Sequence, residues 1–277
     1  MKLFNLRLTT LKSKLYAIVF ASFVVRVVAF FLLPSTPSAL GPDEGAYGKA
    51  ANWTALGNSA SEFPVYGSSL YASGKSLLLP AAFFNKIGLN PLQSVRLTAS
   101  LYGFLLIFLI VRIVLKTALE QAKFVEFIER NSRFFYSLFI VFILLPSHFV
   151  WSILGLRESA TEFWVIGTFA FLFIIFHLKK RLSFFTICGF TFSIIMVFSA
   201  RPQVGWVLGL TLILYLFIRI RSRISRLLIP LTALGVLVGY APTVASTVEI
   251  STGFIAREAY PRSTPSISAP TPNKTPK

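Results

Sequence analysis

The sequence predicts an all-α, polytopic integral membrane protein with about seven transmembrane helices and interfacial helices in its first outer loop. Of the 277 residues, 55% are hydrophobic and only 13% are charged, whereas a soluble globular chain carries about 25% charged residues. The mean hydropathy is +0.72, and basic residues gather on alternate connections between the apolar stretches. This composition excludes a disordered chain, a nucleic-acid-binding domain and a water-soluble enzyme.

Apolar stretches long enough to cross a bilayer define the spans. A transmembrane helix needs about 20 mostly apolar residues, and somewhat shorter stretches can cross upright or where the bilayer is thin. The apolar stretch 76–89 is too short to span and contains Pro80, so we expect a helix lying in the membrane interface. The predicted spans cover residues 15–33, 92–114, 134–154, 161–178, 183–200, 203–219 and 227–247.

The basic residues give these spans an orientation, because Lys and Arg collect in short cytoplasmic loops. We therefore expect a cytoplasmic N-terminus over 1–14, a seven-span module over 15–247, a first outer loop over 34–91 and an outer tail over 248–277. The net charge of +17 is then a topology signal, not a site for a polyanion. The basic residues on the cytoplasmic side are Lys2, Arg7, Lys12, Lys14, Lys116, Lys123, Arg130, Arg133, Lys179, Lys180, Arg181, Arg219, Arg221, Arg223 and Arg226.

Three smaller signals complete the organisation. The first span is expected to be a retained signal anchor, because its apolar run is too long for a signal-peptide core and more spans follow. Pro, Ser and Thr dominate the tail, which is expected to be disordered. The single Cys188 excludes a disulfide framework, and His148 and His177 lack the spacing of metal ligands.

Two adjacent acidic residues, Asp43 and Glu44, stand near the start of the first outer loop. A proline followed by two acids is typical of a first helical turn. Tyr47, Ala50 and Ala51 then share one helical face, which packs either on the membrane or on the bundle. The acids are candidates for chemistry just above the bilayer, and the alternative is that they cap the helix and interact with its dipole.

Two other outer connections also carry charges. Arg157 and Glu158 lie in the short connection between spans three and four, and Arg201 lies between spans five and six. The alternatives are an Arg157–Glu158 ion pair, a capping role for Glu158, and an Arg201 that extends to the lipid headgroups.

Three arginines, Arg26, Arg96 and Arg112, lie within predicted spans, and the first two are candidate buried charges. Arg26 is near the middle of span one, where an arginine costs about 2.5–3.5 kcal/mol on the insertion scale. It should face the bundle interior and contact an acidic or carbonyl partner, so it is a candidate functional charge or a structural ion pair. Arg96 is near the outer end of span two and is a second candidate buried charge, or extends to the headgroups.

Together these groups favour chemistry on a lipid phosphate. Arginine binds phosphate through a planar, permanently charged fork, and a carboxylate can take a proton from an attacking hydroxyl. A bilayer delivers a phosphate-bearing substrate laterally. The combination suits sugar transfer from a lipid-phosphate donor.

The sequence resembles the GT-C superfamily of polytopic glycosyltransferases, and in particular the protein-mannosyltransferase-like (family 39-like) members that use polyprenyl-phosphate sugars. The resemblance covers roughly residues 10–245. The basic N-terminus, Arg26 and the Pro-Asp-Glu-Gly-Ala-Tyr segment at 42–47 carry it. The segments 89–97, 152–159 and 200–202 support it.

The resemblance implies roles for the candidate residues. Asp43 would be the general base or would orient the acceptor, with Glu44 as its neighbour. Tyr47 would help to bind substrate, Glu158 would be the second acidic position, and Arg157 and Arg201 would contact the donor phosphate. Some members use a divalent metal ion, but no metal and no cofactor is predicted here.

Members of the family continue beyond a seventh span. The chain is therefore expected to be either an enzyme that works on a polyprenyl-phosphate-linked sugar and an unknown acceptor, or a non-catalytic or truncated accessory protein. A second subunit completing the site is a further possibility. A transporter or flippase of lipid-linked sugars is the remaining alternative. The expected location is the plasma membrane of a bacterium, facing the cell envelope.

Overall fold

The computed structural model describes residues 2–34, 36, 43–58, 74–177, 183–218 and 224–240, and these ranges contain helices and no strand. The last helix runs over Ile224–Tyr240. The other helices are α1 (Lys2–Leu32), α2 (Glu44–Ala55), α4 (Lys75–Lys86), α5 (Pro91–Glu120), α6 (Ala122–Arg130), α7 (Ser132–Leu144), α8 (Pro146–Ile153), α9 (Arg157–His177), α10 (Phe184–Ala200) and α11 (Pro202–Ile218).

Three helices are long and apolar enough to cross a membrane, namely Leu6–Leu32, Pro91–Glu120 and Arg157–Phe176. The remaining predicted spans correspond to shorter apolar helices. At a rise of 1.5 Å per residue, the 17-residue α10 and α11 are each about 25 Å long, against a hydrocarbon core of about 30 Å. The shorter apolar helices are Ser132–Leu144, Phe184–Ala200, Pro202–Ile218 and Ile224–Tyr240.

The predicted span 134–154 is two helices in the structure. α7 ends at Leu144, Leu145 has φ −50° and ψ 124°, and α8 begins at Pro146. A proline has no N–H for the helix and disfavours the helical conformation of the residue before it. The break therefore follows from Pro146.

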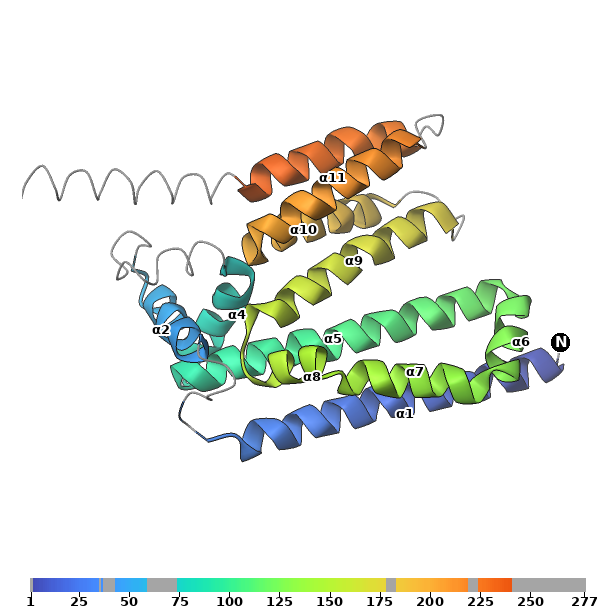
Figure 1. The fold of residues 1–277 in the computed structure, drawn as a ribbon, viewed down its shortest axis with the longest axis horizontal. Coiled ribbons are helices and arrows are strands. Elements are labelled where there is room, and N and C mark those ends of the chain that lie inside the picture. Colours follow the sequence, from blue (N-terminus) through green and yellow to red (C-terminus); the bar gives the residue numbers. More distant parts are fainter. Residues whose placement is uncertain are drawn as a thin grey trace, which may run out of the picture.

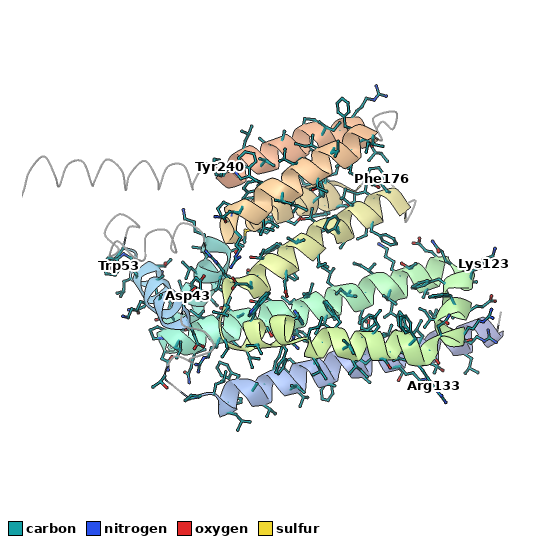
Figure 2. All side chains as sticks on the ribbon, in the orientation of Figure 1. Asp43, Trp53, Lys123, Arg133, Phe176 and Tyr240 are labelled. Atoms are coloured by element: carbon teal, nitrogen blue, oxygen red, sulfur yellow. The ribbon has the colours of Figure 1, made fainter. Side chains whose placement is uncertain are left out.

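The helices form a bundle with two distinct ends (Figure 1). Figure 2 shows Asp43, Trp53 and Tyr240 toward one end, and Lys123 and Arg133 toward the other, where the N-terminus also lies. We call these the α2 end and the N-terminal end. Helices α2 and α4 lie at the α2 end (Figure 1), where both pack against α5.

The outward-facing side chains of the bundle are large and apolar. Phe20 is 67% exposed, Phe185 83% and Ile218 78%, and many neighbours along the same helices are similar. A soluble protein rarely exposes such contiguous apolar surface. The helices are thus compatible with an integral membrane protein.

Core packing holds α2 and α4 against the rest of the bundle at the α2 end. One of its clusters joins Tyr47, Ala51, Leu77 and Val95 with Ala160 at the start of α9. The predicted face with Tyr47 and Ala51 therefore packs on the bundle, not on the membrane. Gly48 lies directly against α5, because a Cβ there would be in van der Waals contact with the backbone at Leu92, at 3.4 Å.

Candidate functional site

Asp43 immediately precedes α2. Its backbone carbonyl accepts a hydrogen bond from the Tyr47 amide at 3.0 Å, as expected at the start of a helix. Its side chain is exposed and makes no capping hydrogen bond to α2. The capping alternative is therefore not supported for the Asp43 carboxylate, which stays available to a ligand.

Glu44 is fully buried and forms an ion pair with Arg96. The Arg96 Nη2 to Glu44 Oε2 distance is 3.0 Å, and Arg96 Nε donates to Glu44 Oε1. Arg96 also donates to the carbonyls of Pro34 and Thr36. This arrangement ties the start of α2 to α5 and to the segment after α1. Arg96 is 1% exposed, so the prediction of a buried charge is confirmed and the alternative of extension to the headgroups is wrong.

The Tyr47 hydroxyl lies within electrostatic range of four predicted site residues. Burial raises the pKa of Tyr47 well above its ordinary value. The Arg157 guanidinium opposes this shift, the Glu158 and Asp43 carboxylates add to it, and the Arg201 guanidinium opposes it. Tyr47 is therefore a neutral hydroxyl that can donate and accept hydrogen bonds.

Glu158 and Arg201 form a second ion pair between Arg201 Nη2 and Glu158 Oε1. Glu158 is in the first turn of α9, and Arg201 follows α10 in an extended conformation before Pro202. The side chains are 19% and 37% exposed respectively. The partner of Glu158 is thus an arginine 43 residues away, which sequence spacing does not reveal.

The turn that immediately precedes Arg157 and Glu158 is held close to α5. Gly155 has φ +69°, and a Cβ there would lie 2.9 Å from Val95 Cγ1. Glycine adopts this left-handed conformation without strain. Three separate connections therefore come together at the α2 end, contributing Asp43 with Tyr47, Arg157 with Glu158, and Arg201.

A second polar cluster, centred on Arg26, lies inside the bundle. Arg26 is 2% exposed and donates to the Ser22 carbonyl at 3.2 Å and to the Ser22 hydroxyl. Its Nη2 lies 3.0 Å from His148 Nε2, and His148 Nδ1 lies 2.8 Å from Glu162 Oε2. The expectation that Arg26 faces the interior and contacts a carbonyl is confirmed.

The two hydrogen-bond partners of His148 determine which of its ring nitrogens donates and which accepts. A guanidinium is a donor only, so His148 Nε2 must accept from Arg26. The Nδ1 atom then donates to Glu162 Oε2. Sequence reasoning missed His148 and Glu162, although a buried arginine in a span requires partners of this kind.

Gly103 makes room for the cluster. A Cβ on Gly103 would lie 2.5 Å from Ser152 Cβ and 3.0 Å from Arg26 Nε. Helices α1, α5 and α8 therefore approach one another at this level. The apolar ring of Phe149 lies 5.7 Å from the Arg26 guanidinium carbon, which adds a cation–π contact.

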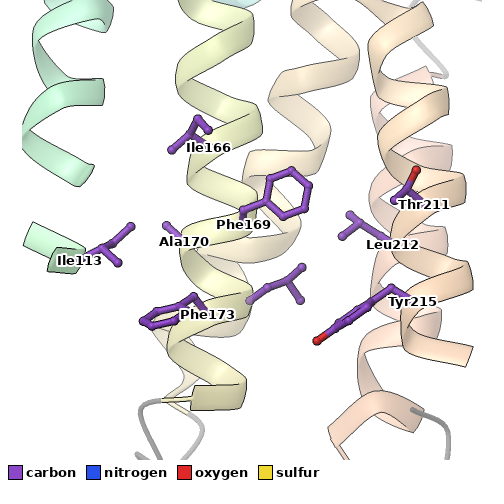
Figure 3. Close-up of a pocket in the computed structure, with 9 residues that line it drawn as sticks. Ile113, Ile166, Phe169, Ala170, Phe173, Thr211, Leu212 and Tyr215 are labelled. Atoms are coloured by element: carbon purple, nitrogen blue, oxygen red, sulfur yellow. The ribbon is translucent and has the colours of Figure 1, made fainter. Parts of the chain in front are cut away.

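An apolar pocket lies between α5, α9 and α11. It has a volume of about 490 Å³. Figure 3 shows its lining, which includes Ile113, Phe169, Phe173, Leu212 and Tyr215. Among the residues that the structure describes, the lining contains no charged side chain, so the pocket suits a hydrocarbon chain and not a headgroup.

Within the part of the chain that the structure describes, no three His, Cys, Asp or Glu side chains gather to hold a metal ion. The site at the α2 end instead offers two arginines, two carboxylates and a phenol. Comparison with known proteins finds no matching family model, no matching curated protein and no matching solved structure.

Proposed function

We propose that this protein is a membrane glycosyltransferase of the GT-C type that moves a sugar from a polyprenyl-phosphate donor to an acceptor hydroxyl. The observation that carries the proposal is the grouping of Asp43, Tyr47, Arg157, Glu158 and Arg201 at one end of an apolar helix bundle. Permanent cations beside an exposed carboxylate suit a reaction in which a phosphate leaves and a hydroxyl attacks.

In the proposed reaction, the acceptor oxygen attacks C1 of the sugar. The bond between C1 and the phosphate oxygen breaks, and polyprenyl phosphate leaves with the bonding electrons. Asp43 takes the proton of the acceptor hydroxyl. Arg157 and Arg201 stabilise the charge that develops on the phosphate, and Glu158 orients Arg201 through their ion pair. Tyr47 is 1% exposed, so in this proposal it supports the site from within the core and does not contact the donor directly.

Glu44 has a positioning role in this proposal. Its two carboxylate oxygens face the Arg96 guanidinium, so it holds the start of α2 in place. Asp43 is the preceding residue in the chain and depends on that position. The proposed base is therefore Asp43 alone.

The apolar pocket supports a lipid-linked donor. Ile166, which lines the pocket, is nine residues after Arg157 in α9. At 1.5 Å per residue this is about 14 Å along the helix axis. Nine residues are about two and a half helical turns, so the pocket lies on the other face of α9 from Arg157, and its support for a lipid-linked donor is its apolar lining alone.

We also propose how the helices and the N-terminus are placed in the membrane. The seven apolar helices cross the bilayer, α2 and α4 lie at the outer interface, and the N-terminus is cytoplasmic. The basic N-terminal end supports this orientation. Leu79 and Phe83 of α4 are 58% and 61% exposed, and an apolar outer face suits a helix in the interface. The expected location is a bacterial plasma membrane, with the tail outside.

The test is sugar transfer by the purified full chain in lipid nanodiscs. Donors would be polyprenyl phosphates carrying different hexoses and pentoses, and the readout would be release of polyprenyl phosphate. We expect turnover with at least one donor and a loss of at least about 100-fold in Asp43→Asn, the usual range for a general base.

Glu126→Gln is the matched control, because it removes one carboxylate from an exposed position at the N-terminal end. It should turn over like the natural sequence. Equal activity of Asp43→Asn would exclude the assigned base. Movement of a labelled donor across proteoliposomes without bond cleavage would favour the transporter alternative, and binding without either activity would favour an accessory protein.

A further inference from the structure

A cationic pocket lies between α1 and α5, in the half of the bundle nearer the N-terminal end. It is lined by Lys12 and Tyr16 of α1 and by Arg112, Leu115 and Leu119 of α5, and its volume is about 280 Å³. Lys12 and Arg112 are both exposed. The pocket therefore presents two cations beside an apolar wall.

In the described part of the chain, no acidic side chain neutralises these two cations. Among the residues that the structure describes, no carboxylate lies within 4.0 Å of the Lys12 or Arg112 nitrogen atoms. Arg112 Nη1 donates only a long hydrogen bond of 3.5 Å, to the Tyr16 hydroxyl. Charged side chains in a membrane-facing segment are costly unless they have a counter-charge or contact water.

The depth of the pocket matches the headgroup level of a bilayer. Lys12 is 20 residues from Leu32 at the far end of α1, and Arg112 is 21 residues from Pro91 at the far end of α5. These separations are about 30 Å along each helix, which equals the thickness of the hydrocarbon core. Both cations thus reach the level of the phosphates in the leaflet at the N-terminal end.

We infer that this pocket binds the headgroup phosphate of an anionic phospholipid from that leaflet. Lys12 and Arg112 supply the positive charge, and basic pockets between transmembrane helices are known sites for such headgroups. Tyr16, whose oxygen accepts from Arg112, keeps its own O–H for a phosphate oxygen. Leu115 and Leu119 contact the first part of an acyl chain. The inference requires the chain to be in a membrane, but it does not depend on glycosyl transfer.

The test is native mass spectrometry of the full chain in a neutral detergent, with added phosphatidylglycerol or phosphatidylcholine. The natural sequence should retain phosphatidylglycerol and not phosphatidylcholine. Lys12→Gln/Arg112→Gln should bind phosphatidylglycerol about 30-fold more weakly, since each basic residue near a membrane surface contributes a factor of about five. A large excess of inorganic phosphate should not displace the lipid.

Lys14→Gln/Arg133→Gln is the matched control. It removes two exposed cations from the same end, but Lys14 lies over the Tyr136 ring and neither residue lines the pocket. Its affinity should change less than about twofold, as expected for charges that act only through a screened field. Equal losses in both double variants would overturn the inference in favour of diffuse attraction.

Three other results would also overturn it. They are unchanged binding in Lys12→Gln/Arg112→Gln, equal retention of phosphatidylcholine, and displacement of the lipid by inorganic phosphate. If the double variant does not fold, the single Lys12→Gln at an exposed position gives the same comparison, with an expected loss of about fivefold. The Lys14→Gln single variant is then its control.

Discussion

At the α2 end of the bundle, charges of opposite sign contact one another, whereas at the N-terminal end exposed cations line a pocket without a nearby carboxylate. Glu44 pairs with Arg96 and Glu158 with Arg201 at the first end. Lys12 and Arg112 have no such partner among the described residues at the second. Paired charges can be buried and can build a defined site, whereas unpaired cations require water or a phosphate.

The two ends also differ in how deeply their ion pairs are buried. The Arg96 and Glu44 side chains are 2% and 0% exposed. The Arg7–Glu129 pair at the N-terminal end has a distance of 3.2 Å between Arg7 Nη1 and Glu129 Oε2, and its side chains are 43% and 41% exposed. A buried pair strongly constrains the helices that it joins, because losing one partner leaves an uncompensated charge.

The largest expected effect is therefore at the buried pair. We expect Glu44→Gln to lower the free energy of unfolding by about 3–5 kcal/mol, because Arg96 then stays buried without its counter-charge. Denaturant unfolding followed by circular dichroism measures the change. The double variant Glu44→Gln/Arg96→Gln should recover part of the loss, and a single-variant cost below about 1 kcal/mol would contradict the burial.

The second-largest effect on the free energy of unfolding is expected at the Arg26 cluster. We expect His148→Phe to cost about 2–3 kcal/mol in the same assay, because it removes an acceptor from Arg26 and a donor from Glu162. His148→Gln is the control, since an amide offers both an acceptor and a donor, and it should cost less. If the two variants are equal, the hydrogen bonds of His148 do not stabilise the bundle.

A substitution in the Glu158–Arg201 pair should weaken ligand binding much more than it lowers stability. Arg201→Gln is expected to cost less than about 1 kcal/mol of stability, because the pair is partly exposed. Binding of polyprenyl phosphate should nevertheless weaken by about tenfold or more, the usual value of a charge-assisted hydrogen bond. A direct binding measurement with polyprenyl phosphate tests this. The control is Arg130→Gln, which removes an exposed cation at the N-terminal end.

The smallest effect is expected at the exposed pair. Arg7→Ala should change the free energy of unfolding by no more than about 0.5 kcal/mol, and any change should vanish in high salt. The measurement is the same unfolding assay at two ionic strengths. A cost comparable to that of Glu44→Gln would remove the contrast between the two ends.

The positions of the helices could be predicted, because runs of apolar residues define them directly. A described helix lies at each apolar stretch, including the short one at 76–89, which became α4. The break at Leu145 was missed although Pro146 marks it in the sequence, since the run is apolar on both sides. The residues that gather at the α2 end were also identified, because they share the same side of an alternating topology.

The ion-pair partners could not be predicted. The sequence predicts that Arg201 extends to the lipid headgroups or contacts a donor phosphate, and that Glu158 pairs with Arg157 or caps span four. The structure instead joins Arg201 to Glu158. Likewise, Arg26 and His148 are 122 residues apart, and no spacing rule connects positions on different helices.

The sequence by itself determined which segments are apolar helices and at which end of them each charge emerges, since both follow from composition along the chain. Only the tertiary structure decided which charges meet. A contact between helices depends on how far each is rotated and tilted against its neighbour, and this is set by packing, such as the close approaches at Gly48, Gly103 and Gly155. A change of one residue in helical register turns a side chain by about 100°, so partners separated in sequence are fixed only when the whole bundle is packed.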